Sequence, residues 1–478
     1  MKRILISLAC ALFALAAASC ASIQPREGCI NIYPREKVAE VSPLFWGTNF
    51  LFWVEDDEAL ADGSIEQSLR ELPCRILRYP GGTVADNFHW ETNMLDNPAC
   101  FPYEQGEAES DFEEFMAFCG RVGAEPMLVV NTQSWALRGD IAGGAAEAAR
   151  WVRYCREHGH KVKYWEIGNE TYWHPVMTAH EYGALVREYS RAMKAEDPSI
   201  IVSANGGWTE EMTGDKERLD STLLPDVRER ILAVRTPAEY KALGDEIKAH
   251  TAKPWTTGED KWWDGVLAEC ADDIDMVSVH WYYFDNNVKN IDRAITKLKN
   301  HLREKSGGKD YLFCLSEYNC NTPEHPDRVC GFAESLGRFL VAGVDISCEW
   351  PLRIGGASYR SMLNLKTKEP QYAYEFFQLF QREFTGPMVR CDNDSDDLYT
   401  FASLSRSGGA IVISSRRLSA PQEIRVRPLQ KVNEASVTCY TPDEKGLHAI
   451  PSEREFTLED GEIHFTIDPM TIIFIRIK

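Results

Sequence analysis

The sequence predicts an α/β protein, a (β/α)₈ TIM barrel followed by a C-terminal antiparallel β-sandwich. Two observations support this fold class. Between about residues 41 and 385, short β-rich runs alternate with helix-length stretches, which is the pattern of a parallel sheet covered by helices. From residue 386 to 478, only short strand patterns separated by turns appear, as in a sandwich. A chain of 478 residues can hold both domains.

The first region contains eight β-rich runs, enough to close a barrel. They cover residues 45–53, 75–79, 127–131, 162–167, 200–204, 276–282, 311–315 and 344–350. Helical patterns at residues 111–121, 144–158, 179–197 and 332–342 lie between them. Residues 206–274 are long, charged and rich in tryptophan, and we interpret them as an insertion over the barrel mouth that contains helices.

The second region has strand patterns at residues 398–403, 410–414, 423–426, 435–440, 463–467 and 471–477. No helical period interrupts them, which favours a small antiparallel sandwich. Residues 21–40 form a separate N-terminal segment, and we expect residues 28–40 to add a strand to this sandwich from the other end of the chain.

Residues 1–20 have the pattern of an export signal. Lys2 and Arg3 precede an apolar run over residues 4–18 that is short for a membrane span. Residues 17–20 resemble a bacterial lipoprotein cleavage box, which would make Cys20 the lipidated first residue. An ordinary signal peptide cut nearby is the alternative. Either way we expect an exported protein, anchored in the cell envelope (periplasm or outer membrane) only through its N-terminus, or secreted.

Charge and composition narrow the partners. The formal net charge of −21 argues against nucleic acid and anionic membrane surfaces, whereas a neutral poly- or oligosaccharide fits it. No Cys/His spacing indicates a zinc site, and no cofactor is implied. Several cysteines (Cys74, Cys119, Cys155, Cys314, Cys348) lie in apolar runs and are expected to be buried thiols. Cys320 and Cys330 flank a loop and could pair. An oligomer is compatible with this sequence.

Two short segments carry the chemistry: WEIGNE at residues 165–170 and LSEYN at residues 315–319. Glu170 follows the fourth predicted strand and Glu317 the seventh, so both lie at the end of the barrel where active sites occur. Strands four and seven are on opposite sides of an eight-membered ring. Two facing carboxylates are what cleavage of a glycosidic bond requires, roughly 5–5.5 Å apart for retention and roughly 6.5–9.5 Å for inversion.

Four motifs in order resemble a known group of enzymes. RYPGG at 78–82, WEIGNE, SVHWY at 278–282 and SEYN at 316–319 are similar to the clan A retaining glycoside hydrolases, and within them to family 51, mainly α-L-arabinofuranosidases. The order and spacing match from about residue 40 to 385, and the trailing sandwich matches too. The resemblance implies that Glu170 is the general acid/base and Glu317 the nucleophile. An ordinary surface carboxylate is the alternative for either one.

Further side chains at the strand ends are candidate substrate-binding residues. Arg78, which ends strand two, is expected to keep Glu317 ionised. Asn169 is expected to donate to a sugar hydroxyl, with a turn residue as the alternative. Glu166 is expected to face a different direction from Asn169 and to be a structural ion-pair member.

Three aromatic or imidazole side chains complete the candidate set. His280 and Tyr282 end strand six and are expected to orient Glu317 or line the first sugar subsite. Trp350, which ends strand eight, is expected to stack on a sugar face. Aromatic packing at the barrel rim is the alternative for all three. Gly81 and Gly82 are expected to allow a tight turn or the close approach of a ligand.

Two positions depart from the family pattern. Leu51 stands where family 51 usually has a glutamate that grips arabinose, and Thr83 stands where an asparagine usually follows the double glycine. Both missing groups bind substrate, so cleavage is better supported than arabinose specificity. An α-L-arabinofuranosidase acting on plant-type polysaccharide is therefore the first hypothesis and an endo-acting β-glycanase of the same clan the second. A non-catalytic glycan-binding barrel and a metal-dependent hydrolase are further alternatives.

Overall fold

The computed structural model describes residues 23–72, 74–95, 110–173, 177–212, 261–283, 288–321, 325–356, 358–405 and 407–478, with four single residues between 213 and 260. The predicted export signal and most of the predicted insertion lie outside the described residues. The described ends of the insertion include one helix, α10 (Trp262–Cys270).

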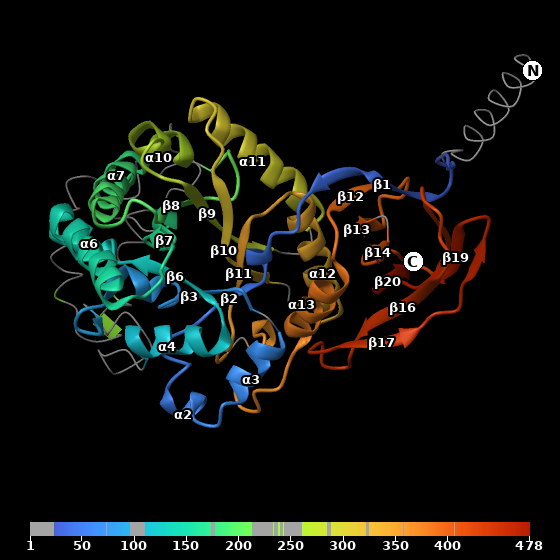
Figure 1. Cartoon of the computed structure of the whole chain (residues 1–478), viewed down its shortest axis with the longest axis horizontal. Coiled ribbons are helices and arrows are strands. Elements are labelled where there is room, and N and C mark those ends of the chain that lie inside the picture. Colours follow the sequence, from blue (N-terminus) through green and yellow to red (C-terminus); the bar gives the residue numbers. More distant parts are fainter. Residues whose placement is uncertain are drawn as a thin grey trace, which may run out of the picture. The chain divides into compact units, whose positions relative to one another are not determined.

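Eight parallel strands close into a barrel, which confirms the first part of the predicted fold (Figure 1). They are β2 (Gly47–Asn49), β3 (Ile76–Tyr79), β6 (Glu125–Val130), β7 (Tyr164–Ile167), β8 (Ile201–Gly206), β9 (Met276–Tyr283), β10 (Leu312–Cys320) and β11 (Ile346–Glu349). Each predicted run overlaps one of these strands, and β6, β8, β9 and β10 extend beyond their predicted runs. β10 continues to Cys320, so Glu317 lies within strand seven and does not follow it.

Helices surround the barrel strands (Figure 1). The α-helices are α2 (Asp57–Leu60), α3 (Ser64–Glu71), α4 (Phe112–Val122), α5 (Gln133–Arg138), α6 (Ile141–His158), α7 (Ala179–Glu196), α11 (Ile291–Lys305), α12 (His325–Val341) and α13 (Tyr372–Glu383). Short 3₁₀ turns η1 (Pro43–Phe45), η2 (Thr83–Asn87), η4 (Thr171–Trp173), η5 (Val288–Asn290) and η6 (Ser358–Arg360) and the hairpin β4 (Phe88–His89) with β5 (Met94–Leu95) lie in the loops. Capping boxes begin α4 at Asp111 and α7 at Thr178, because each of these side chains accepts the N3 backbone N–H.

The C-terminal strands form one sheet with the N-terminal segment. It contains β1 (Ile30–Ala39), β12 (Met388–Asp392), β13 (Tyr399–Ser405), β14 (Gly408–Ser414), β15 (Gln422–Pro428), β16 (Ala435–Pro442), β17 (Ala449–Glu453), β18 (Thr457–Glu459), β19 (Glu462–Ile467) and β20 (Ile472–Ile477). β1 pairs antiparallel with β12 and parallel with β15. Val437 of β16 and Phe465 of β19 belong to the same core although their strands lie near opposite ends of the sheet order, so the sheet curls into a sandwich.

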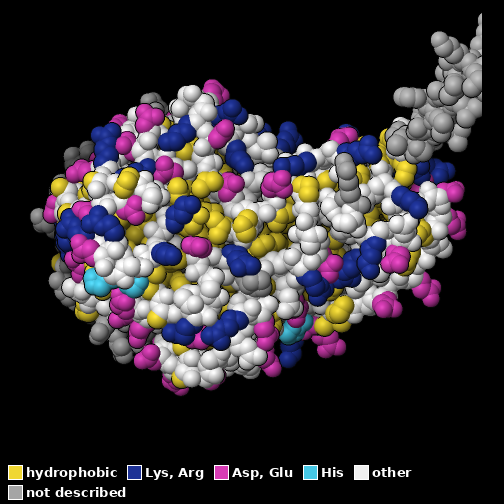
Figure 2. Space-filling view, in the orientation of Figure 1, with side chains coloured by type: hydrophobic (Ala, Val, Ile, Leu, Met, Phe, Trp, Pro, Cys, Tyr) yellow, Lys and Arg dark blue, Asp and Glu magenta, His cyan; other side chains and the backbone are white. Residues whose placement is uncertain are grey.

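The chain divides into two compact units. One holds the described residues up to Glu40 with Arg382–Thr441 and Ile450–Lys478, and the other holds Val41–Gln381 with Pro442–Ala449. Acidic and basic side chains are interspersed on the face shown in Figure 2, where hydrophobic side chains gather over the middle of the barrel unit. Among the described residues, no helix is both long and apolar enough to cross a bilayer.

All cysteines of the described part of the chain are free thiols. Ten of them are buried and Cys391 is half-buried. This confirms the expected buried thiols in the apolar runs. Cys320 and Cys330 are both buried and form no disulfide, so the pairing considered from the sequence does not occur in this structure.

Candidate active site

The alternation of side chains along the barrel strands places polar residues above an apolar floor. Ile76, Tyr164 and Cys314 belong to one hydrophobic cluster inside the barrel. The residues two positions further along the same strands are Arg78, Glu166 and Ser316, which face the same way because side chains repeat with period two. A second layer, wholly buried and polar, therefore lies on the first.

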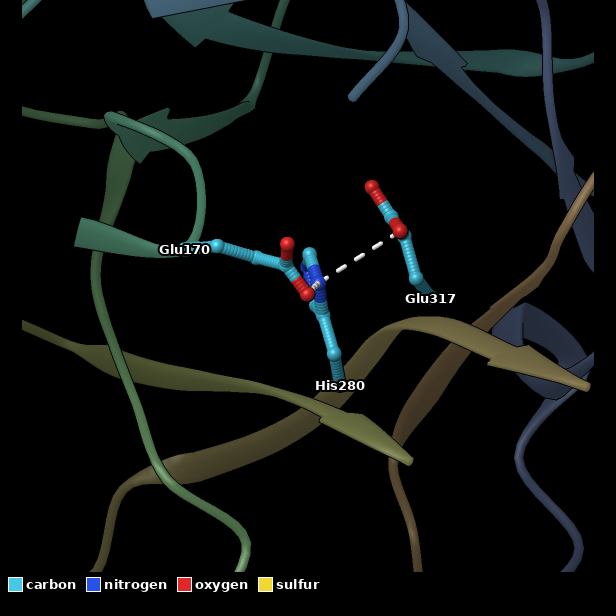
Figure 3. Close-up of side chains that lie close together, drawn as sticks. All are labelled: Glu170, His280 and Glu317. Atoms are coloured by element: carbon cyan, nitrogen blue, oxygen red, sulfur yellow. Dashed lines mark hydrogen bonds and ion pairs between the residues drawn. The ribbon is translucent and has the colours of Figure 1, made fainter. Parts of the chain in front are cut away.

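Three side chains meet at the C-terminal end of the barrel. His280 Nδ1 lies 2.9 Å from Glu170 Oε1 and 3.4 Å from Glu317 Oε2, and one oxygen of each carboxylate lies within 4.8 Å of the other and of the imidazole (Figure 3). The strand register between β10 and β9 shifts between Leu315 and Glu317, which turns Glu317 into the barrel opening. Strands four, six and seven thus bring together residues that are far apart in the sequence. His280 lies 110 positions after Glu170, and Glu317 lies 147 positions after it.

Glu317 is surrounded by donors. Arg78 Nη1 donates to its Oε1 at 2.9 Å and the Tyr282 hydroxyl donates to its Oε2 at 2.8 Å. Burial raises the pKa of Glu317 from its ordinary value and Glu170 adds to this, while His280, Arg78 and Tyr282 act in the opposite direction. For His280, burial lowers the pKa, but the two glutamates outweigh burial and the net shift is upward.

The guanidinium of Arg78 joins four strands of the barrel. Its Nε donates to Glu166 at 2.6 Å, its Nη1 to Asn49 at 2.9 Å, and its Nη2 to Asn169 Oδ1 at 2.7 Å. The structural ion pair expected for Glu166 is confirmed, and Ser316 completes its hydrogen bonds at 2.8 Å. Because Arg78 only donates, it fixes the Asn169 amide with Oδ1 toward the guanidinium, which leaves Nδ2 as the donor end.

Trp350 lies against the double glycine. A Cβ atom on Gly82 would lie 2.9 Å from Trp350 Cη2 and 3.0 Å from Glu317 Oε1, so only glycine permits this approach. Gly81 has φ of 139° and faces the Trp53 ring in the same way. Trp350 therefore stands beside Glu317, the nucleophile candidate, and its stacking on a sugar face stays a prediction.

The two departures from the family pattern occupy different settings. Leu51 is wholly buried, so it presents no surface to a ligand in this structure. Thr83 is exposed at the start of η2. The nearest acidic residue along the chain from Leu51 is Glu55, which is wholly buried and paired with Arg353 at 2.7 Å. Glu55 therefore does not replace the missing glutamate.

Several polar residues of the site escaped the sequence analysis. Asp86 is 1% exposed and accepts the Thr132 hydroxyl at 2.7 Å. Burial raises the pKa of Asp86 to about 7, against its hydrogen bonds and Arg78. Asn49 accepts from Arg78 and donates to the Ser316 carbonyl at 3.0 Å. Asp86 lies four positions after Gly82, the end of the RYPGG motif. This closeness is the feature of the sequence that could have indicated Asp86 as a site residue.

The effect of burial on the pKa of Glu349 can be tested through protein stability, without an activity assay. It is wholly buried, and burial raises its pKa well above 4.5 against hydrogen bonds from Thr48 and Asn319. The folded protein therefore holds a proton that the unfolded chain releases above pH 4.5, so stability falls with rising pH in this window, by about 1.4 kcal/mol per pH unit. We expect Glu349→Gln to remove this loss. Urea unfolding at pH 5 and pH 8 would measure it, and an equal pH effect in both proteins would contradict the prediction.

The Glu170, His280 and Glu317 group could also hold a metal ion, since each offers one ligand atom. No ligand spacing in the sequence indicates this group, because its three members are far apart along the chain. Sensitivity of activity to a chelator separates the two uses.

The barrel brings two glutamates and a histidine together at the C-terminal end of its strands. Residues 68–230 match the family model described as "Alpha-L-arabinofuranosidase 1 domain". "Alpha-L-arabinofuranosidase C" of Emericella nidulans is 30% identical over 41% of this chain and 45% of its own length. An "Intracellular exo-alpha-(1->5)-L-arabinofuranosidase" of Acetivibrio thermocellus is 31% identical over 37% of this chain and 41% of its own. The chain thus spans less than half the length of these relatives.

Solved structures share the whole fold at low identity. The family 51 α-L-arabinofuranosidase of Thermotoga petrophila superposes with a TM-score of 0.67 and 18% identity over 94% of this chain and 100% of that one. The family 51 arabinofuranosidase of Xanthomonas axonopodis gives 0.68 and 14% over 94% and 99%. These findings confirm the resemblance to glycoside hydrolase family 51 and the predicted barrel-plus-sandwich fold.

Proposed function

We propose that this protein is a retaining glycoside hydrolase whose first substrate class is the α-L-arabinofuranosides of plant-type polysaccharides. The observation that carries the proposal is the pair of glutamates at the ends of strands four and seven with oxygens within 4.8 Å of each other. A close approach of the two carboxylates favours direct attack by a carboxylate, because attack by water needs a wider separation. The matched arabinofuranosidase family model supports the choice of sugar.

In the proposed double displacement, Glu317 attacks the anomeric carbon while Glu170 gives its proton to the departing oxygen. The C–O bond to the leaving group breaks, and a glycosyl ester forms on Glu317. Glu170, now ionised, takes a proton from water, whose oxygen attacks the same carbon and releases Glu317. Arg78 and Tyr282 hold the nucleophile, and the Asn169 Nδ2 group is the proposed donor to a sugar hydroxyl, since Arg78 occupies its Oδ1.

The environment of Glu317 sets the acid side of the pH profile. Glu317 must be ionised to attack, and its raised pKa places the loss of kcat/KM on acidification above pH 4.5. The Tyr282 hydroxyl stabilises the charged form, so Tyr282→Phe is expected to move this limb to higher pH and lower kcat/KM by about 10–100-fold. A pH–rate profile of both proteins measures it, and an unmoved limb would contradict the assignment.

The function is tested with a panel of p-nitrophenyl glycosides, led by the α-L-arabinofuranoside, with wild type and Glu317→Ala compared under identical purification. Release by the wild type that the variant lacks, and that survives EDTA, would support a metal-independent glycosidase, and the active sugar would name the specificity. Silence on all small glycosides would sink the exo-acting arabinofuranosidase. Loss of activity in EDTA that zinc restores would favour the metal-dependent alternative.

An endo-acting β-glycanase is the second candidate because of Leu51 and Thr83. A buried leucine and a threonine replace two groups that grip arabinose in family 51, so the site has fewer anchors for that sugar. A solved structure titled as a bifunctional glucanase-xylanase, CelM2, has the same fold, with a TM-score of 0.63 at 14% identity over 95% of this chain and 99% of that one. Reducing-end release from xylan or β-glucan, without release from p-nitrophenyl arabinofuranoside, would support this candidate.

We also propose export as a lipoprotein, on the basis of Lys2, Arg3, the apolar run and Cys20. In a bacterial host, labelled palmitate is expected to enter the wild type, which sediments with membranes, and not Cys20→Ala. Unlabelled wild type in the soluble envelope fraction would favour the ordinary signal peptide.

A further inference from the structure

Asp86 connects three loops at the barrel opening. It sits in η2 directly after the double glycine that follows strand two, and both of its carboxylate oxygens lie 3.2 Å from the backbone nitrogen of Asn169. The hydroxyl of Thr132, which follows strand three, donates to its Oδ1 at 2.7 Å. The Asp86 carboxylate therefore accepts hydrogen bonds from the turn that follows strand four and from the loop that follows strand three.

The turn that it holds has an unusual backbone. Glu170 has φ of 46°, in the left-handed region that side chains other than glycine rarely adopt, and Gly168 has φ of 72°. Such a conformation persists where the surroundings over-determine it. The two peptide N–H groups that flank Glu170 are fixed from outside the turn, that of Asn169 by Asp86 and that of Thr171 by Asn205 at 3.0 Å.

Little space separates Gly168 in this turn from the side chains of Thr132 and Asp86. A Cβ atom on Gly168 would lie 2.5 Å from Thr132 Oγ1 and 3.1 Å from Asp86 Oδ1. The turn can therefore rest on the Asp86–Thr132 pair only because residue 168 is glycine. If Asp86 lost its carboxylate, the Asn169 N–H would lose its buried acceptor, and the 168–170 turn would lose one of the hydrogen bonds that hold it from outside.

We propose that Asp86 is a positioning residue that holds the acid/base Glu170 in register with Glu317. This inference rests on the proposed function. Glu317 is held by hydrogen bonds from Arg78 and Tyr282, whereas Asp86 holds the turn that carries Glu170. Loss of Asp86 therefore impairs proton donation to the leaving group more than nucleophilic attack, which it affects only through the neighbouring Asn169.

The kinetic test compares Asp86→Ala and Asp86→Asn on aryl α-L-arabinofuranosides whose leaving groups range from 2,4-dinitrophenol to phenol. We expect kcat/KM of Asp86→Ala to fall about 100-fold for the phenyl substrate, as for a catalytic group displaced by about an ångström, and far less for the dinitrophenyl one, which needs no proton. Asp86→Asn keeps one acceptor for the Asn169 N–H and should recover part of the loss. Asp111→Asn, which removes a carboxylate cap at α4, is the matched control.

A double-mutant comparison checks that Asp86 acts through Glu170. Adding Asp86→Ala to Glu170→Ala is expected to lower kcat/KM no further, because the group that it positions is already absent. Equal losses for all leaving groups, or a full additional loss in the Glu170→Ala background, would overturn the proposal. If Asp86→Ala does not fold, the same comparison with Asp86→Asn decides it.

A crystal structure of the Asp86 variant gives a readout that needs no turnover. We expect the 168–170 turn to change and Glu170 to leave positive φ. An unchanged turn would overturn the positioning role whether or not any glycoside is hydrolysed. A changed turn in a protein whose wild type hydrolyses nothing would support the role of Asp86 in holding the turn and overturn the proposed function alone.

Discussion

Azide is expected to rescue glycosyl transfer by the two glutamate variants and to give products of opposite configuration. In Glu170→Ala, Glu317 still forms the glycosyl ester from an activated substrate, and azide then attacks the ester without needing a base, so the glycosyl azide keeps the configuration of the substrate. In Glu317→Ala, azide occupies the space of the missing carboxylate and attacks the substrate directly, so the configuration inverts. This difference follows from the proposed roles, in which the two carboxylates act on opposite sides of the sugar.

Without azide, we expect Glu317→Ala to lose about 10⁴-fold or more in kcat, and Glu170→Ala about 10²–10⁴-fold on substrates that need protonation. Proton NMR of the azide products gives the anomeric configuration. Glu166→Gln is the matched control, since this buried glutamate lies at the same barrel end and contacts Arg78 but neither of the two carboxylates. The same product configuration from both glutamate variants would refute the assignment of roles.

Replacement of Arg78 is expected to cost both stability and activity. Arg78→Met leaves Glu166 and Glu317 buried without their cation, and breaking such a buried pair costs about 3–5 kcal/mol in unfolding free energy. Activity should fall by at least about 100-fold, because Glu317 loses a charge-assisted hydrogen bond and its pKa rises further. The acid limb of kcat/KM therefore moves to higher pH. Arg78→Lys keeps the charge but not the fork of donors, and should recover little.

Urea unfolding and pH–rate profiles measure the two effects separately. Arg338 is the matched control, because it is also buried and paired, with Glu334 and Asp292, on the outer helix α12. Arg338→Met is expected to lower stability without moving the pH profile. An Arg78→Met protein with wild-type stability, or with an unmoved acid limb, would show that Arg78 does not hold the charge of Glu317.

The barrel strands could be predicted because each lies in a short β-rich stretch that is mostly apolar, as buried parallel strands are. The strand ends were less accurate. The run that predicts strand seven stops at Leu315, because Ser316 and Glu317 are polar, yet the strand continues to Cys320 since those polar groups are paired inside the barrel. A pattern of hydrophobicity cannot mark a strand whose polar residues are satisfied by partners elsewhere in the chain.

The candidate site shows the same limit. Glu170, Glu317 and Arg78 were found because they lie in recognisable motifs at strand ends. Asp86 and Glu349 were not, because their importance lies in what surrounds them, and their burial follows from packing between distant strands. The contact of His280 with both glutamates likewise depends on the register of β9 and β10, which the sequence does not state.

The way in which Arg78 is neutralised also limits how such a barrel can change over evolutionary time. Two carboxylates share one buried cation, and one of them is the proposed nucleophile. In a descendant that lost the proposed hydrolysis and kept only sugar binding, mutation of Glu317 would leave the buried Arg78 with Glu166 as its one remaining partner in this set. Loss of Glu317 therefore needs a compensating change near Arg78, so stability as well as the proposed chemistry constrains the Arg78–Glu166–Glu317 set.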